Sequence, residues 1–188
     1  MKKAEPNFGD LASQVPGLRN LVSKFRSLFQ QSLAKLPPSR QELDLRIELV
    51  DNPSFRRPYH VKLSPREEQE LRQQLQEFLD KGFIEPTVAE FPSPILFASK
   101  KDGGLRLCIN FRSLNSNVCS DTFQMPHIEQ LLSRTSGAKF FKNTLLSGFH
   151  QLLVDPSSRD LLSFSCPLGV FRWVVTPFGF KNSPSAFQ

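Results

Sequence analysis

Residues 94–115 read PILFASKKDGGLRLCINFRSLN and are the most informative stretch of the chain. Two apolar segments, Ile95–Ala98 and Leu105–Phe111, flank Lys101-Asp102-Gly103-Gly104, a pattern typical of a β-hairpin. Side chains alternate across a strand, so the second segment has an apolar face and a polar face. The polar face consists of Arg106, Cys108, Asn110 and Arg112. The sequence therefore predicts a basic hairpin with two arginines projecting on one side.

The spacing of apolar residues predicts three further elements upstream of the hairpin. From Leu18 to Leu33 apolar residues recur at three- and four-residue steps, as in an amphipathic helix. Interior packing explains such a helix more often than a membrane surface does, although both readings fit the pattern. Leu43–Val50 alternates like a half-buried strand. A second helix begins after Ser64, in a Ser-x-x-Glu capping box with Pro65 at the first helical position, and stops at Lys81-Gly82.

Shorter elements are expected downstream. Pro126 opens a short helix that should turn Ile128, Leu131 and Leu132 inward. Strand-like runs follow at Gln151–Val154, Leu161–Cys166 and Val170–Val175. Ser183, as a cap, and Pro184, at the first helical position, announce a last helix. The sequence ends barely one turn into it, and an isolated turn does not recover its nucleation cost, so we expect the chain to be cut off within the fold.

Composition narrows the class of protein. With 188 residues, 39% hydrophobic and 22% charged, the chain fits one compact domain with a looser arm. A net charge of +6 favours a polyanionic partner, and a solvated basic surface without a partner is the open alternative. No apolar run approaches the roughly 18 residues that span a bilayer, so we expect no membrane contact and a location in the cytoplasm or nucleus. The three cysteines are far apart and predict reduced thiols rather than a zinc site.

The order of these motifs resembles the polymerase region of gypsy-type LTR retrotransposon polyproteins. The resemblance runs through Lys81–Pro86, the hairpin with Asn110–Asn115, Ser147–Gln151 and Pro177–Gln188. It implies an α+β fold, namely a partial right-hand polymerase with fingers and the beginning of a palm behind a helical N-terminal arm. Residues 1–60 would form the arm and connector, and residues 61–188 a truncated reverse transcriptase domain.

The resemblance also assigns roles to single residues. Lys100 and Arg106 match the family's pair that clamps the incoming nucleoside triphosphate, and Phe149 matches the aromatic residue that excludes a ribose 2′-hydroxyl. Phe178 and Gly179 match the loop that supports the templating base and the nucleotide. Without the family, these would be a solvated turn, a core phenylalanine and a turn before a helix. His150 has no carboxylate or nucleophile beside it in a known constellation, so we expect it to be structural.

The acidic residues of polymerase chemistry are missing. Members of the family hold two Mg²⁺ ions with an Asp four residues before the glycine of the Ser-Gly-aromatic turn and with two more in a Tyr-x-Asp-Asp hairpin. Here Thr144 occupies the first position, Asn143 is no better, and residues 161–188 contain no Asp or Glu. A neutral hydroxyl is a weak ligand for a hard cation, so we expect no catalytic residue, metal or cofactor in this chain. We expect Asp155 and Asp160 to face water.

Three functions remain open at this stage. The chain is an inactive or partial RNA-directed DNA polymerase, which is the preferred interpretation, or a retained nucleic-acid-binding module, or a fragment that binds another protein through exposed apolar surface. The expected partner is an RNA or DNA template-primer, with weaker binding of a nucleoside triphosphate. The sequence does not determine the oligomeric state.

Overall fold

The computed structural model describes residues 36–56, 59, 61–100, 103–121, 127–133 and 147–187, together with Asn20 and Lys24. The chain divides into two compact units, Met1–Leu33 and Ala34–Gln188. The helix expected at 18–33 lies outside the described residues apart from Asn20 and Lys24, which are both helical. The sheet and the candidate site belong to the second unit.

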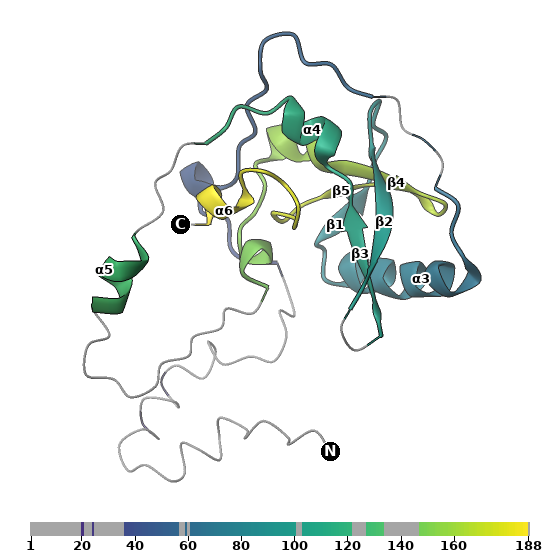
Figure 1. Cartoon of the computed structure of the whole chain (residues 1–188), viewed down its shortest axis with the longest axis horizontal. Coiled ribbons are helices and arrows are strands. Elements are labelled where there is room, and N and C mark those ends of the chain that lie inside the picture. The colour runs from purple at the N-terminus through teal and green to yellow at the C-terminus, as the bar shows by residue number, and fades with distance from the viewer. Residues whose placement is uncertain are drawn as a thin grey trace. The chain divides into compact units, whose positions relative to one another are not determined.

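Within the described residues, five strands form one mixed sheet in the order β1-β5-β4-β2-β3 (Figure 1). The strands are β1 (Ile84–Pro86), β2 (Ser93–Ser99), β3 (Leu105–Ile109), β4 (Ser163–Cys166) and β5 (Gly169–Trp173). Neighbours pair antiparallel except β2 and β4, which run parallel. The helices are α3 (Pro65–Asp80), α4 (Arg112–Ser116), α5 (Ile128–Ser133) and α6 (Ser183–Ala186), and 3-10 turns occur at η2 (Gln41–Leu43), η3 (Gly148–Gln151) and η4 (Pro156–Leu162). The predicted α+β class is confirmed.

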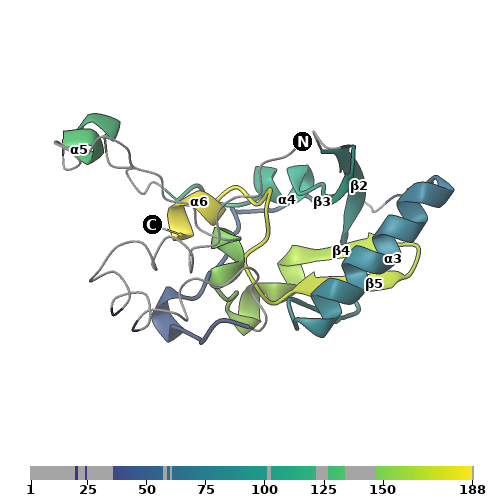
Figure 2. The same cartoon turned by 90° about the horizontal axis from the view of Figure 1, so that it is seen from below.

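Helix α3 begins and ends where the sequence predicts. The Ser64 side chain accepts from the backbone N–H of Glu67, and the Glu67 carboxylate accepts from the N–H of Ser64, which completes the capping box. At the other end the chain turns at Gly82, whose φ of +70° strains any residue with a side chain. Leu71 and Leu75 are buried from the apolar stripe of the helix. Figures 1 and 2 show α3 alongside the sheet.

Gln74 joins α3 to β3, which is an edge strand. Its side-chain amide donates to the carbonyl of Leu105 at 3.0 Å and accepts from the N–H of Leu107 at 3.1 Å. An edge strand otherwise leaves such groups to water or to another chain. The Gln74 side chain therefore satisfies two backbone groups on the outer edge of β3 and fixes the hairpin on α3.

The β2–β3 hairpin has the predicted register. Ile95 pairs with Ile109 and Ala98 with Arg106. Ile109 is buried and Arg106 is exposed, as the alternation requires. The strand ends at Ile109, earlier than predicted, and the exposed Arg112 is the first residue of α4. The core beneath this face and around α3 includes Leu71, Ile84, Ile95, Leu162, Phe164 and Trp173.

Other elements differ from the expectation. The strand expected at Leu43–Val50 is not formed: residues 45–50 make only isolated bridges, from Leu45 to Val154 and from Leu49 to Val118, because the partners are single residues of loops rather than strands. Leu43 lies in η2 and is 68% exposed.

Two helix details also differ. Leu132 of α5 is 64% exposed instead of pointing inward, and the side chains of Ile128 and Leu131 lie outside the described set. Helix α6 begins at Ser183 itself, after Asn182, and the Ser183 hydroxyl donates to the carbonyl of Pro177 at 2.9 Å instead of capping the helix. The run expected at Gln151–Val154 forms no strand: Gln151 ends the 3-10 turn η3, and Leu153 and Val154 form isolated bridges with Val175 and Leu45.

Candidate nucleotide and nucleic-acid site

The tip of the β2–β3 hairpin presents Lys100 and Arg106 on one face. Arg106 lies opposite Ala98, and Lys100 follows Ala98 by two residues, so the two cations project to the same side. The N–H of Lys100 donates to the carbonyl of Gly104 at 2.7 Å, which closes the turn. Both side chains are exposed and have no hydrogen bond or ion pair with any residue that the structure describes. They are therefore free to bind a ligand.

Arg66 adds a third cation at this tip, which sequence reasoning missed. Its Nη2 donates to the carbonyl of Gly103 at 2.7 Å, from the first turn of α3. In the sequence, Arg66 is only a charged residue inside a predicted helix. Its contact with the hairpin turn depends on the packing of α3 against the hairpin, which the sequence does not show. One N–H group of the Arg66 guanidinium holds the turn, so its other N–H groups remain available to an anion bound at the hairpin tip.

The Ser147–Gln151 segment and the Pro177–Gly179 loop meet in an aromatic cluster. The ring of Phe149 lies 5.1 Å from that of Phe178 and 5.8 Å from that of Phe187. A Cβ on Gly148 would lie 3.0 Å from the Phe187 ring, so a larger residue here would require that ring to shift. Phe178 is 55% exposed and Phe149 is half-buried. The fold thus brings two of the predicted site residues together, while Lys100 and Arg106 lie on the separate hairpin surface.

Asn115 ties the loop of Phe178 and Gly179 to the end of the hairpin. Its side-chain amide donates to the carbonyl of Gly179 at 2.9 Å and accepts from the N–H of Lys181 at 2.9 Å. Gly179 has a φ of +87° and faces the carbonyl of Ile109. Asn115 belongs to the Asn110–Asn115 motif of the sequence. Its role as an anchor of the loop was not predicted, because the partner, Gly179, lies 64 positions away.

His150 is packed among aromatic rings rather than placed for acid–base chemistry. It is 7% exposed and stacks on Trp173 at 5.4 Å, with the rings of Phe78, Phe83 and Phe178 around it. Burial, with a smaller contribution from the charge of Lys81, lowers its pKa to about 4. The imidazole is therefore neutral at pH 7 and acts as a packing group.

The carboxylates nearest to this region are committed to other partners. Asp155 caps η4 through Ser157 and pairs with Arg46 at 3.1 Å, and its hydrogen bonds to Ser157 are the main cause of a pKa below the usual value. Asp160 is exposed and pairs with Arg172 at 2.6 Å.

The described residues do not fit a pair of magnesium ions. Nowhere among them do three or more His, Cys, Asp or Glu side chains gather in a way that could hold a metal. Thr144, at the expected Asp position, lies outside this set and supplies only a neutral hydroxyl.

The described helices include none that is long and apolar enough to cross a membrane.

Comparisons with known proteins agree with this geometry. Residues 98–188 match a family model described as "Reverse transcriptase (RNA-dependent DNA polymerase)". The chain is 33% identical to the enzymatic polyprotein of Cauliflower mosaic virus (strain Strasbourg), over 89% of this chain and 26% of the relative. It is 31% identical to the Pol polyprotein from transposon 412 of Drosophila melanogaster, over 100% of this chain and 15% of the relative. It therefore spans about a quarter or less of these relatives.

Solved structures show the same fold. Prototype foamy virus protease-reverse transcriptase superposes with a TM-score of 0.69 at 21% identity, covering 99% of this chain and 24% of that one. The foamy viral protease-reverse transcriptase in complex with RNA/DNA hybrid superposes with a TM-score of 0.68 at 18% identity, covering 98% and 26%.

Proposed function

We propose that this chain, which carries a reverse transcriptase-like domain of the kind found in retroelement polyproteins, holds an RNA or DNA template-primer but does not itself incorporate nucleotides. We also propose that its source is a gypsy-type element. The observation that carries the binding role is the exposed pair Lys100 and Arg106, which has no partner among the described residues and lies on a hairpin fixed by α3. A structural neighbour solved with an RNA/DNA hybrid and another with double-stranded DNA support a nucleic-acid partner.

The chemistry of the two cations fits phosphate. Arg106 offers a planar set of donors that suits two phosphate oxygens at once, and Lys100 adds a mobile point charge on the same face. Cations that neutralise phosphates release condensed counterions, which makes binding strong at low salt and steeply salt-dependent. A nucleoside triphosphate presents the same chemistry with fewer phosphates, so the chain should bind it more weakly than a strand.

The absence of incorporation follows from ligand chemistry. Two-metal phosphoryl transfer needs anionic oxygens to hold both cations, and Thr144 stands where the first carboxylate belongs. The only tyrosine of this sequence is Tyr59, so it contains no Tyr-x-Asp-Asp pair. Asp155 and Asp160 are engaged by Arg46 and Arg172.

Fluorescence anisotropy across a salt series tests the binding role. Each phosphate contact to a single strand contributes about −0.7 to the slope of log K against log salt, so Lys100→Ala with Arg106→Ala should flatten the slope by about 1.4. At 0.1 M salt this corresponds to about 25-fold weaker binding. The matched control, Arg40→Ala with Arg72→Ala, removes the same charge from exposed positions away from the hairpin tip and should leave the slope unchanged. Equal slopes in both double variants would show that net charge alone attracts the strand.

Primer extension with Mg²⁺ or Mn²⁺ tests the absence of chemistry. The chain should bind the labelled template-primer and add no nucleotide, and Thr144→Asp should not restore addition because it supplies only one of three carboxylates. Template-dependent extension by the unaltered chain would refute the proposal.

A further inference from the structure

A cavity of about 720 Å³ opens at the end of the hairpin that is distant from Lys100. Its walls come from the segment before α3, the segment between β1 and β2, and the first residues of α4. The lining residues that matter here are Phe55, Arg56, Glu90, Phe91, Arg112 and Asp160. The volume lies in the range of small-molecule sites. Neither the aromatic cluster of Phe149 nor the Lys100–Arg106 pair belongs to it.

Two aromatic rings that stack on each other line this cavity. Phe55 and Phe91 are stacked, with ring centroids 5.6 Å apart and an interplanar angle of 22°. Phe91 is nevertheless 40% exposed, so part of its ring is open to solvent. An exposed aromatic face of this kind is a surface on which a nucleobase stacks, whatever its sequence.

The wall is held in place before any ligand arrives. The side chain of Asn117, just after α4, accepts from the N–H of Ser54 at 2.8 Å and donates to the carbonyl of Ser54 at 2.9 Å. The N–H of Arg56 donates to the hydroxyl of Ser113 at 3.2 Å. Phe55 lies between these two anchors, so its ring is fixed to α4.

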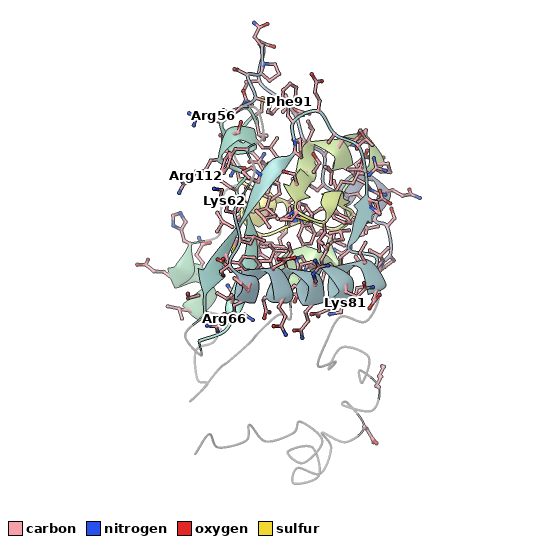
Figure 3. All side chains as sticks on the ribbon, turned by 90° about the vertical axis from the view of Figure 1, so that its right-hand side faces the viewer. Arg56, Lys62, Arg66, Lys81, Phe91 and Arg112 are labelled. Carbon is pink, nitrogen blue, oxygen red and sulfur yellow. The ribbon has the colours of Figure 1, made fainter. Side chains whose placement is uncertain are left out.

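Two guanidinium groups stand at the cavity. Arg56 and Arg112 are exposed, and neither side chain has a partner among the residues that the structure covers. Figure 3 shows Arg56 and Phe91 at the same end of the molecule with Arg112 close by. Of the two acids in the lining, Asp160 is neutralised by Arg172 at 2.6 Å, which leaves Glu90 as the one open carboxylate of the described lining. The cavity therefore favours an anion.

Further cations continue from the cavity toward the hairpin tip. In Figure 3, Arg56, Arg112, Lys62 and Arg66 follow one another along one edge of the molecule. Arg66 ends this line because its Nη2 bonds the carbonyl of Gly103 at the tip. A row of exposed cations matches the repeated phosphates of a strand better than it matches one acidic side chain of a peptide.

We propose that the cavity binds an unpaired nucleotide of a single-stranded segment, with its base on the Phe91 ring and its phosphate between Arg56 and Arg112. The site rests on the proposed nucleic-acid role and extends it from phosphate attraction at the hairpin to the capture of one base. Glu90 can accept a hydrogen bond from an exocyclic amino group, so cytosine or adenine should bind better than uracil.

Two octanucleotides of equal charge separate base binding from phosphate binding. One is oligocytidylate and the other consists of abasic units, and both are measured by anisotropy with the full chain. Phe91→Ala should weaken binding of the first by about 5- to 150-fold, the range for the loss of one base stack, and change binding of the second by less than about twofold. Leu43→Ala, a truncation of another exposed apolar residue outside the cavity, should change neither.

Photochemical cross-linking uses the unaltered chain, so its result does not depend on whether the Phe91→Ala variant folds. An oligocytidylate octanucleotide with a single 5-iodocytosine, cross-linked to the unaltered chain, should attach within the peptides that carry Phe55 or Phe91. Attachment only at the hairpin, or stronger binding of a phosphotyrosine peptide than of the octanucleotide, would overturn the site.

The pattern across variants separates this site from the proposed function. Loss of binding in Lys100→Ala with Arg106→Ala, but not in Phe91→Ala, overturns the cavity site and leaves the proposed function standing. Loss of binding in Phe91→Ala, but not in Lys100→Ala with Arg106→Ala, supports the cavity site and shows that the hairpin is not the principal binding surface.

Discussion

Replacing His150 by phenylalanine should remove most of the dependence of stability on pH between pH 5 and pH 8. His150 is 7% exposed, sits on Trp173, and has an Nε2 without a hydrogen-bond partner in the described structure. Its neighbours are rings from α3, the segment after α3, β5 and the Phe178 loop, and the nearest charge is the cation of Lys81. Each of these features disfavours an imidazolium.

The magnitude follows from the pKa in the two states. Burial lowers the pKa of His150 from 6.5 to about 4 in the folded chain, so the unfolded chain binds more protons between these values. Stability is therefore fully present above pH 6.5 and is lost as the pH falls toward 4. At about 1.4 kcal/mol per pKa unit the complete loss is about 3 kcal/mol, and about 2 kcal/mol of it has occurred at pH 5.

Urea unfolding at pH 5, 6, 7 and 8, followed by the emission of the single tryptophan, measures this loss. Other groups with lowered pKa values do not interfere, because Glu67 and Asp155 titrate below 4.5 and 3.8 respectively. His150→Phe keeps a ring of similar size and removes an unsatisfied nitrogen, so its free energy of unfolding should vary by less than about 0.5 kcal/mol over the range. His127→Asn, at an exposed position, should behave like the unaltered chain. If His150→Phe lost as much stability at pH 5 as the unaltered chain, the reasoning would be refuted.

Three substitutions test how the scaffold is fixed, each by urea unfolding at pH 7. Ser64→Ala removes the cap of α3 and should cost about 1 kcal/mol, whereas Ser64→Asp should retain most of the stability. Gly82→Ala should cost about 1–2 kcal/mol, because it forces a side chain into a φ of +70° with its Cβ 3.3 Å from Leu36; a cost near zero would mean that the turn adopts another conformation. Asn115→Ala should cost about 1–2 kcal/mol through its two lost bonds and should speed proteolysis next to Lys181, and unchanged cleavage there would contradict its anchoring role.

The sequence predicted those elements whose signals are local. The capping box of Ser64 and the turn at Gly82 bound one helix completely, because every group that they satisfy lies within a few residues. The hairpin around Gly103-Gly104 was predicted for the same reason, and its alternation correctly placed Arg106 on the exposed face. The predicted strand was too long, because Arg112 already belongs to α4.

Features that depend on distant partners were predicted less well. Alternation in Leu43–Val50 indicated a strand, but a strand needs a continuous partner, and here only Val118 and Val154 offer single bridging residues. Ser183 has the residue type of a cap, yet its hydroxyl binds Pro177, to which the returning loop brings it. Such choices between alternative hydrogen-bond partners are made by tertiary structure, and a sequence pattern does not contain them.

The same distinction applies to the site. Lys100, Arg106 and Phe149 were predicted as site residues because the family motif fixes residue types, and their roles stay predictions. The contacts of Arg66 and Asn115 and the cavity at Phe91 depend on packing between segments. Capture of a strand by cations and rings tolerates positional change, since a phosphate or a base can meet any of several donors or faces. Metal-dependent chemistry does not, because each cation needs anionic oxygens at fixed places. We therefore expect a neutral residue at position 144 to abolish metal-dependent chemistry, while the hairpin, which is held by Gln74, keeps the geometry on which the proposed capture of a strand depends.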